Sequence, residues 1–465
     1  MGRPCLSGAA MLRLFGICFL VLLAALLGCG GSSGAPVFVR ASLASHRFTL
    51  ANGLDVVLHP DPSFRSVAVN MRYDVGSRND PEGRTGLAHL VEHLTFRGKP
   101  DGKLDTFSLL EERGSTEHNA TTSTDATCYF ETVPSEELPL ALFIEAFRMA
   151  RPLDGVDEPV FAAETHVVRN ERRQRVDNVP YGNLDAIATY LLLDGHAYGR
   201  PTVGFAEDLE RLTLADAQKF VAQYYRPNNA TLVIAGGFEP RRATALVHEL
   251  FDAIPGAPIP AAKAVQWSSL GRKPVHTTMA TGAEAPAVAL GWIVPAAGAL
   301  GWHEMVLTAE MFGGWTKYRM GDKVRRIWTE VSSMEQLSVF MVCAELDAGA
   351  SPDELIDTID REIEWLADSG ADVRLGGEKS RLLARRTLAL EDIEHRAGIL
   401  QTYVARYGNP DSIQAELHEF SVVSRRDIAN SVERFLRRGR RVRVDAVPRP
   451  GAPKAGTWPT IGGRP

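Results

Sequence analysis

The chain has 465 residues, 45% of them hydrophobic and 23% charged, which is enough for large apolar cores and for roughly two to four domains. Its formal net charge of -6 is small for this length and no long basic run occurs, so no nucleic-acid partner is expected. Outside the N-terminal segment only Cys128 and Cys343 remain, and a single pair this distant in sequence is not a disulfide framework. Both are expected to be buried thiols.

The N-terminal residues 1–28 have the pattern of a signal peptide. The apolar run from Leu14 to Leu27 follows two arginines and is shorter than the roughly 20 residues that a membrane-spanning helix needs. It ends in Leu26-Leu27-Gly28-Cys29, which resembles a bacterial lipobox, so we expect cleavage before Cys29 and lipidation of that cysteine. Residues 29–43 would then be a flexible tether for an exported lipoprotein anchored to a membrane, on the periplasmic side or at the cell surface. The alternatives are cleavage elsewhere or an uncleaved anchor.

Beyond the tether, strand and helix patterns alternate. Asn52-Gly53 between apolar runs predicts a β-hairpin over 46–60. Alternating apolar residues from Val67 to Tyr73 predict a strand with one buried face. The following patterns predict helices at 86–96, 138–150 and 157–175, and a Thr-rich strand at 121–133.

Two pairs of segments indicate an internal duplication. Thr213 with Asp216 starts a predicted helix that leads to a strand at 231–235, and Ser424 with Asp427 repeats this 211 residues later, before a strand at 442–447. The alternating strand around Val288 likewise follows that around Val67 at an offset of 221. We therefore predict an N-terminal domain at 44–253, a linker at 254–273, a homologous domain at 274–447, and a disordered tail at 448–465.

The most specific chemical signal is His89-Leu90-Val91-Glu92-His93, within the helix predicted at 86–96. Histidines four residues apart lie on one helix face and can bind one zinc ion together. Glu92 shares that face and is placed to take a proton from a zinc-bound water as general base. The alternative is an ordinary amphipathic helix with two incidental histidines.

A catalytic zinc ion needs a third protein ligand and an open position. Spacing and residue type leave four candidates open: His118, Glu164, His166 and Glu171. Glu164 and Glu171 lie seven residues apart on one face of the helix predicted at 157–175, about 10 Å apart along its axis, so only one of them could bind the same ion directly.

The inverted order His89-x-x-Glu92-His93 is the inverzincin motif, and the sequence resembles the insulinase/pitrilysin-type zinc peptidases, particularly the short subunits similar to processing peptidases. The resemblance covers about 400 residues and is closer in the first half. It includes Asn119-Ala120-Thr121-Thr122 and His196-Ala197-Tyr198-Gly199-Arg200.

This resemblance implies an α+β fold of two homologous α/β-sandwich domains that form one half of a clam-shell. It also implies zinc bound by His89, His93 and Glu171, with Glu92 as the catalytic base and Glu164 supporting the site. A second similar subunit, identical or different, would supply the other half. Asn119 and Ala120 would bind peptide substrate as an added strand.

The second half departs from the family pattern. It has no second copy of the metal motif, and the substrate-binding Arg/Tyr pair of the family is represented only by Arg325, with Trp328 or Thr329 near the tyrosine position. The implied function is a zinc metalloendopeptidase that cleaves peptides or unfolded segments. The alternatives are a non-catalytic binding or assembly subunit and a zinc hydrolase with another substrate class.

Overall fold

The computed structural model describes residues 43–458, except 101, 194, 262–263, 266–273 and 370–373. The predicted signal peptide, Cys29, nearly all of the tether and part of the linker lie outside the described residues, so those predictions remain untested. In the described part of the chain, no helix is both long and apolar enough to cross a bilayer.

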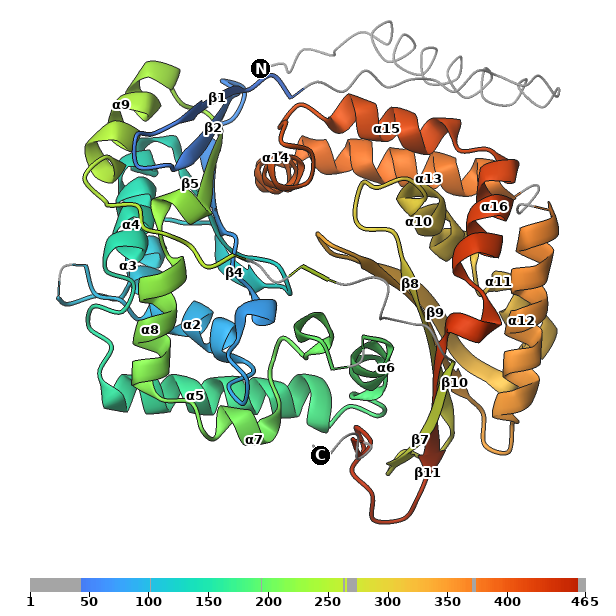
Figure 1. Cartoon of the computed structure of the whole chain (residues 1–465). Coiled ribbons are helices and arrows are strands. Elements are labelled where there is room, and N and C mark those ends of the chain that lie inside the picture. The colour runs from blue at the N-terminus through green and yellow to red at the C-terminus, as the bar shows by residue number, and fades with distance from the viewer. Residues whose placement is uncertain are drawn as a thin grey trace, which may run out of the picture. The chain divides into compact units, whose positions relative to one another are not determined.

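The first half contains a six-stranded sheet in the order β1-β2-β6-β3-β5-β4 (Figure 1). β2 and β6 are parallel and every other neighbouring pair is antiparallel. In the part of the chain that the structure describes, β4 is an edge strand and pairs only with β5. The strands are β1 His46–Thr49, β2 Asp55–Pro60, β3 Ser66–Tyr73, β4 Glu117–Thr122, β5 Thr127–Pro134 and β6 Ala230–Gly236.

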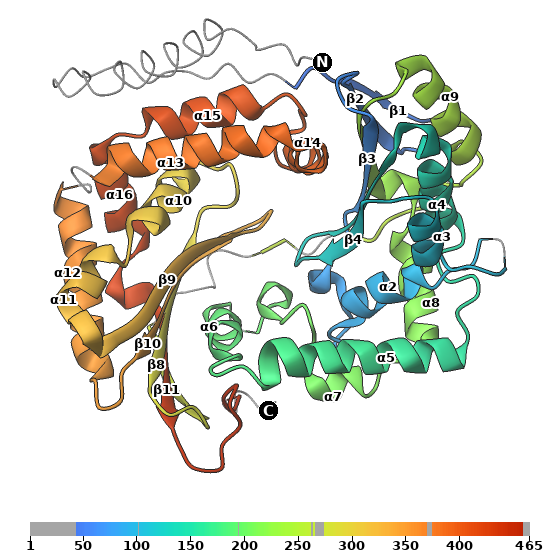
Figure 2. The same cartoon turned by 180° about the vertical axis from the view of Figure 1, so that it is seen from behind.

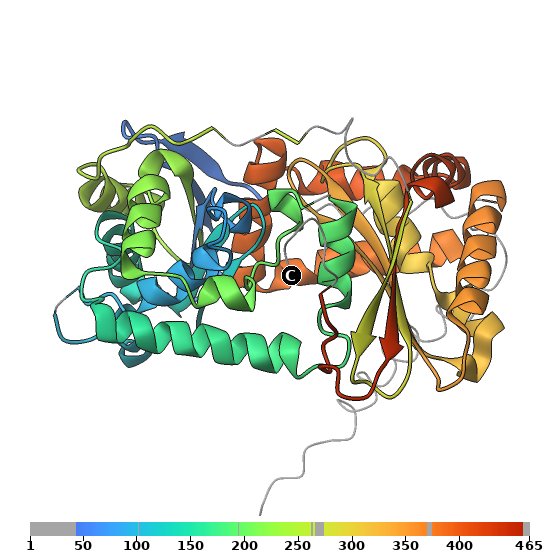
Figure 3. The ribbon, with the colours of Figure 1, turned by 60° about the horizontal axis from the view of Figure 1, so that its bottom comes forward.

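The second half repeats this topology in a five-stranded sheet ordered β7-β11-β8-β10-β9. The one parallel pair, β7 with β11, takes the place of β2 with β6, and the two strands run side by side in Figure 3. The strands are β7 Val275–Thr281, β8 Ala287–Val294, β9 Val324–Ser333, β10 Ser338–Leu346 and β11 Val442–Pro448. The duplication predicted from two short sequence matches is confirmed strand by strand, with β1 as an addition to the first sheet.

Helices connect and cover the strands of both sheets. In the first half they are α2 Leu87–Phe96, α3 Thr106–Glu112, α4 Leu138–Ala150, α5 Glu158–Arg172, α6 Leu184–Leu192, α7 Ala206–Leu209, α8 Leu214–Tyr224 and α9 Pro240–Phe251. In the second half they are α10 Trp302–Met311, α11 Gly314–Met320, α12 Pro352–Ser369, α13 Arg374–Leu388, α14 Ile393–Tyr407, α15 Ile413–Val422 and α16 Arg425–Phe435. A π-helical segment, η3 Arg173–Asp177, continues α5.

Local sequence signals account for several of these elements. The Asn52-Gly53 hairpin joins β1 to β2, and Gly53 has the positive φ of 94° that such a turn requires. Thr213 and Ser424 form capping boxes at the starts of α8 and α16. The prediction of one strand over 121–133 is wrong, because a tight turn at 123–126 separates β4 from β5.

The two halves exchange a helix. α6 follows α5 in the first half but packs on β8 and β11 of the second sheet, where Ile187 and Leu192 join its core. α14 of the second half packs on β3 and β6 of the first sheet, where Leu400 and Tyr403 are buried. Figures 1 and 2 show both helices against the sheet of the other half. Each apolar core is therefore completed by residues from the opposite half.

The predicted disorder of the tail does not hold for residues 448–458. Lys454 O accepts the Tyr181 N–H (3.0 Å), and Thr457 N–H donates to Ala280 O (2.9 Å) at the end of β7. The Trp458 ring packs against Tyr190 and Phe205. A Pro/Gly-rich composition predicts the loss of regular structure, but these backbone groups find partners in neighbouring strands and loops.

Candidate metal centre and active site

The metal motif lies on α2, which is held firmly at its start. The Asp80 carboxylate accepts the backbone N–H groups of Gly86 and Ala88, each at 2.8 Å. Gly86 has a φ of +87°, and a Cβ atom there would lie 2.9 Å from the Val203 carbonyl oxygen, so glycine is required. Leu87, Leu90, Val91 and Leu94 are buried in the core of the first half and fix the rotation of the helix.

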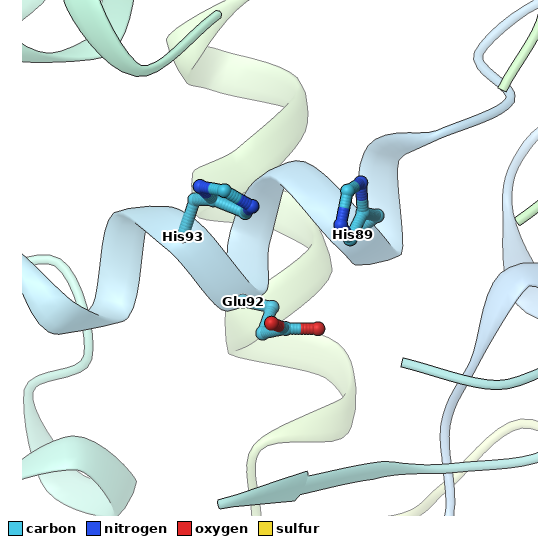
Figure 4. A group of neighbouring side chains, drawn as sticks. All are labelled: His89, Glu92 and His93. Atoms are coloured by element: carbon cyan, nitrogen blue, oxygen red, sulfur yellow. The ribbon is translucent and has the colours of Figure 1, made fainter. Parts of the chain in front are cut away.

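The motif histidines face a carboxylate from α5. The rings of His89 and His93 are 4.9 Å apart on neighbouring turns of α2 (Figure 4). Glu171 Oε2 lies 3.6 Å from His89 Nε2 and 3.3 Å from His93 Nε2. One carboxylate oxygen of α5 therefore lies within 3.6 Å of the Nε2 atoms of both motif histidines.

This donor set fits a zinc ion. With zinc bonds of about 2.0–2.1 Å, the ligand atoms of a tetrahedral site lie about 3.4 Å apart, close to the distances of Glu171 Oε2 from the two histidines. Burial and the neighbouring His93 lower the pKa of His89 to about 4. The His89 imidazole is then neutral at pH 7, which is the form that binds metal ions.

Glu164 supports the site from one side. Its Oε2 lies 3.6 Å from His93 Nδ1, on the ring edge opposite Nε2, and its Oε1 accepts a hydrogen bond from Arg97 Nε at 2.7 Å. Burial alone would lower the pKa of His93, but the hydrogen bond with Glu164 and the nearby carboxylates outweigh it and raise that pKa. Glu164 is thus placed to orient the imidazole rather than to join Glu171 at the same point.

Glu92 has a different environment. Potential ligand atoms of His89, Glu92 and His93 lie within 4.8 Å of one another, so distance alone would also admit Glu92 as a metal ligand. However, its Oε2 is engaged by the Thr122 hydroxyl, which donates a hydrogen bond of 2.5 Å from β4. Burial raises the pKa of Glu92, and the hydrogen bond from Thr122 acts against that rise. A carboxylate of raised pKa next to the candidate metal ligands is suited to proton transfer.

These groups line a cavity of about 740 Å³. Residues 119–122 of β4 form one wall of it, and Asn119 and Ala120 are the two predicted to bind substrate. Among the described residues, no strand pairs with the outer edge of β4, and the Ala120 N–H donates to the Asn119 side-chain oxygen at 2.9 Å. An edge strand beside a cavity can pair with an extended peptide.

Three other predicted candidates are not among the residues that line this cavity. His118 on β4 packs against Phe107 with a ring distance of 4.2 Å, and His166 is exposed on α5. Of the four candidates for the third ligand, only the carboxylates Glu164 and Glu171 therefore reach the histidines. Arg325 on β9 donates to Asp347 Oδ1 at 2.7 Å and is not among the residues that line the cavity.

Sequence reasoning did not identify three polar side chains of the site. Thr122 binds Glu92, Arg97 binds Glu164, and Arg175 Nη1 lies 2.8 Å from the second carboxylate oxygen of Glu171. Arg97 follows His93, and Arg175 follows Glu171, by one helical turn. That spacing is the signal that could have suggested Arg97 and Arg175.

Comparison with known proteins identifies the family of the chain. Residues 55–177 match the family model described as Insulinase (Peptidase family M16), and residues 211–374 match the model described as Peptidase M16 inactive domain. The chain is 30% identical over 349 residues to zinc protease PqqE of Helicobacter pylori, covering 72% of this chain and 77% of the relative.

Solved structures show the same fold. A protease from Helicobacter pylori aligns with a TM-score of 0.79 at 24% identity, covering 87% of this chain and all of that one. The periplasmic protease PqqL from Escherichia coli aligns with a TM-score of 0.69 at 17% identity. There, 88% of this chain corresponds to 48% of the longer protein.

The inverted His-x-x-Glu-His motif is that of the inverzincin class of metallopeptidases. In this chain it lies on α2 of a duplicated α+β fold. Within that class, the chain belongs to the insulinase family, peptidase family M16.

Proposed function

We propose that this protein is a zinc-dependent metalloendopeptidase that hydrolyses peptides or unfolded protein segments. The observation that carries the proposal is the approach of one Glu171 oxygen to both motif histidines, while Glu92 on the same helix is hydrogen-bonded to Thr122. We assign the two histidines and Glu171 as zinc ligands, because Glu171 Oε2 is within 3.6 Å of both imidazoles.

A bound zinc ion would polarise the scissile carbonyl group and make a coordinated water more acidic. Glu92 then accepts the proton of the attacking water and later donates it to the leaving amine. Thr122 holds the carboxylate of Glu92 through its hydroxyl group. Glu164 orients His93 through Nδ1, and Arg97 holds Glu164 in turn.

The edge of β4 supports a preference for extended chains. Backbone pairing with residues 119–122 would hold a substrate strand across the cavity without requiring a particular side-chain sequence. Folded proteins offer few such free strands, so peptides and unfolded segments are the substrates that fit. Arg325 remains a candidate substrate contact from the second half, although its guanidinium is paired with Asp347 here.

We further propose that a second similar subunit completes the working enzyme, since this chain corresponds to about half of the longer periplasmic protease. For localisation, the lipobox-like end of the N-terminal apolar run supports export and anchoring through Cys29. Replacement of Cys29 by serine is expected to release the protein from the membrane fraction. An unchanged membrane fraction would contradict this anchor.

The catalytic proposal is tested by metal analysis together with cleavage of short fluorescence-quenched peptides. The wild type is expected to hold one zinc ion per chain, and His93→Ala to lose it. Glu92→Gln should keep the zinc but lose activity by about 10²–10⁴-fold, the usual contribution of a general base. Peptide hydrolysis by Glu92→Gln at the wild-type rate would contradict the role of Glu92 as general base. If the wild type holds no zinc and is inactive, the protein is better described as a non-catalytic binding or assembly subunit. If it cleaves esters but not peptides, it is a hydrolase of another substrate class.

A further inference from the structure

The second half, which lacks the metal motif, reaches the first half through the turn between β9 and β10. The Glu335 carboxylate in this turn accepts hydrogen bonds from Arg72 Nη2 at 2.9 Å and from Arg78 Nη1 at 2.7 Å. Its backbone N–H donates to Asp125 Oδ2 at 2.9 Å. One residue of the second half thus contacts three charged residues around the first sheet.

Asp125 and Arg78, which both contact Glu335, form a buried ion pair. Their side chains are each only 9% exposed. Asp125 Oδ1 also accepts the Tyr198 hydroxyl at 2.6 Å, while its Oδ2 is bound by the backbone of Glu335. Additional hydrogen bonds offset the cost of burying an ion pair, and Glu335 forms one with each partner.

Asp125 lies in the tight turn at 123–126 that joins β4 to β5. Ser123 N–H donates to Ala126 O at 2.8 Å, which closes the turn. The loop before α2 holds it from the outside, because Ser77 N–H and Arg78 N–H donate to the carbonyl oxygens of Ser123 and Thr124 at 3.0 and 3.1 Å. The turn is therefore fixed by the first half and by Glu335 together.

Thr122, which binds the Glu92 carboxylate, is the residue immediately before this turn. A shift of the turn moves the end of β4, and with it the hydroxyl that orients Glu92. A misplacement of about 1 Å in a catalytic arrangement can reduce the rate by about a hundredfold.

We propose that Glu335 is a positioning residue that acts on the catalytic base through Asp125, the 123–126 turn and Thr122. This inference rests on the proposed role of Glu92 as general base. The second half, which lacks the metal motif, would then contribute to catalysis. It would fix the position of β4, whose Thr122 orients Glu92.

The test uses Glu335→Ala in the full chain, which removes both carboxylate acceptors and keeps the backbone N–H. We expect kcat to fall about tenfold, with KM and zinc content unchanged. Glu335→Gln, which keeps one oxygen acceptor, should restore part of the loss. Glu354→Ala is the matched control, because Glu354 also forms an exposed ion pair, with Lys323, in the second half. It is expected to leave the rate unchanged.

Two further measurements separate positioning from simple destabilisation. Amide hydrogen exchange over residues 117–130 should be faster in Glu335→Ala but not in Glu354→Ala, and this readout does not need activity. If Glu335 acts through Thr122, adding Glu335→Ala to Thr122→Val should slow the enzyme no further. Unchanged exchange, or a fully additive double variant, would overturn the inference. Full hydrolysis by Glu92→Gln would instead overturn the catalytic proposal itself.

Discussion

Glu164→Gln is the most direct test of how the metal centre is supported. Glu164 is buried, with one carboxylate oxygen 3.6 Å from His93 Nδ1 and the other bound by Arg97. Burial alone would raise its pKa, but hydrogen bonds from His93 and Arg97 outweigh this and keep the pKa below its ordinary value. Glutamine keeps the shape of the side chain and removes the negative charge that His93 and Arg97 face.

The size of the effect follows from the position of Glu164 behind the ligand. Loss of the outer partner of a metal-binding histidine typically costs about 10–100-fold in metal affinity. That corresponds to about 1.4–2.8 kcal/mol. His93→Ala removes the ligand itself and should cost more. Zinc affinity is therefore expected to fall in the order wild type, Glu164→Gln, His93→Ala.

The assay is a zinc titration in competition with a chelator of known affinity, at constant pH and ionic strength. Glu158→Gln serves as the control, because it removes an exposed carboxylate from the start of the same helix. Wild-type affinity in Glu164→Gln would show that Glu164 does not orient His93. A loss as large as that of His93→Ala would mean that Glu164 binds the metal directly, and the assignment of Glu171 would be wrong.

Two further predictions concern stability. Burial and a hydrogen bond with Glu117 raise the pKa of Glu394 on α14 from 4.5 to about 7, so its stabilising contribution is complete below about pH 4.5 and is lost as the pH rises through 7. Glu394→Gln should reduce the fall in denaturation midpoint across this range, and an equal fall in both proteins would contradict the assignment. Leu400→Ala on α14 should lower the free energy of unfolding by about 2–5 kcal/mol, because Leu400 is fully buried with residues of the first sheet. A loss below about 1 kcal/mol in chemical denaturation would show that α14 contributes little to that core.

The helix that carries the metal motif, α2, could be predicted because the motif is a local sequence pattern. Two histidines one helical turn apart and an intervening glutamate determine a shared face once the helix forms, and α2 forms as predicted. The third ligand could not be chosen by the same reasoning, because Glu164 and Glu171 share a face of α5. Which of them meets both imidazoles depends on how α5 crosses α2, and only the family resemblance favoured Glu171.

The non-local parts of the fold were beyond sequence reasoning. An amphipathic pattern shows that α6 and α14 each bury one face, but it carries no information on which sheet covers that face. The split of residues 121–133 was missed because Ser123 and Thr124 are compatible with a strand. The capping boxes at Thr213 and Ser424 succeeded because all their partners lie within three residues.

The exchange of α6 and α14 also constrains the order in which the chain can fold. β6 completes the first sheet at Gly236, but the helix that covers part of its apolar surface begins only at Ile393. During synthesis, that surface must stay uncovered until most of the second half has been made. Contacts between segments so distant in sequence form slowly. The nascent chain therefore exposes this apolar, aggregation-prone surface for longer than two independent domains would. A truncation anywhere before α14 would leave the first sheet permanently in that state.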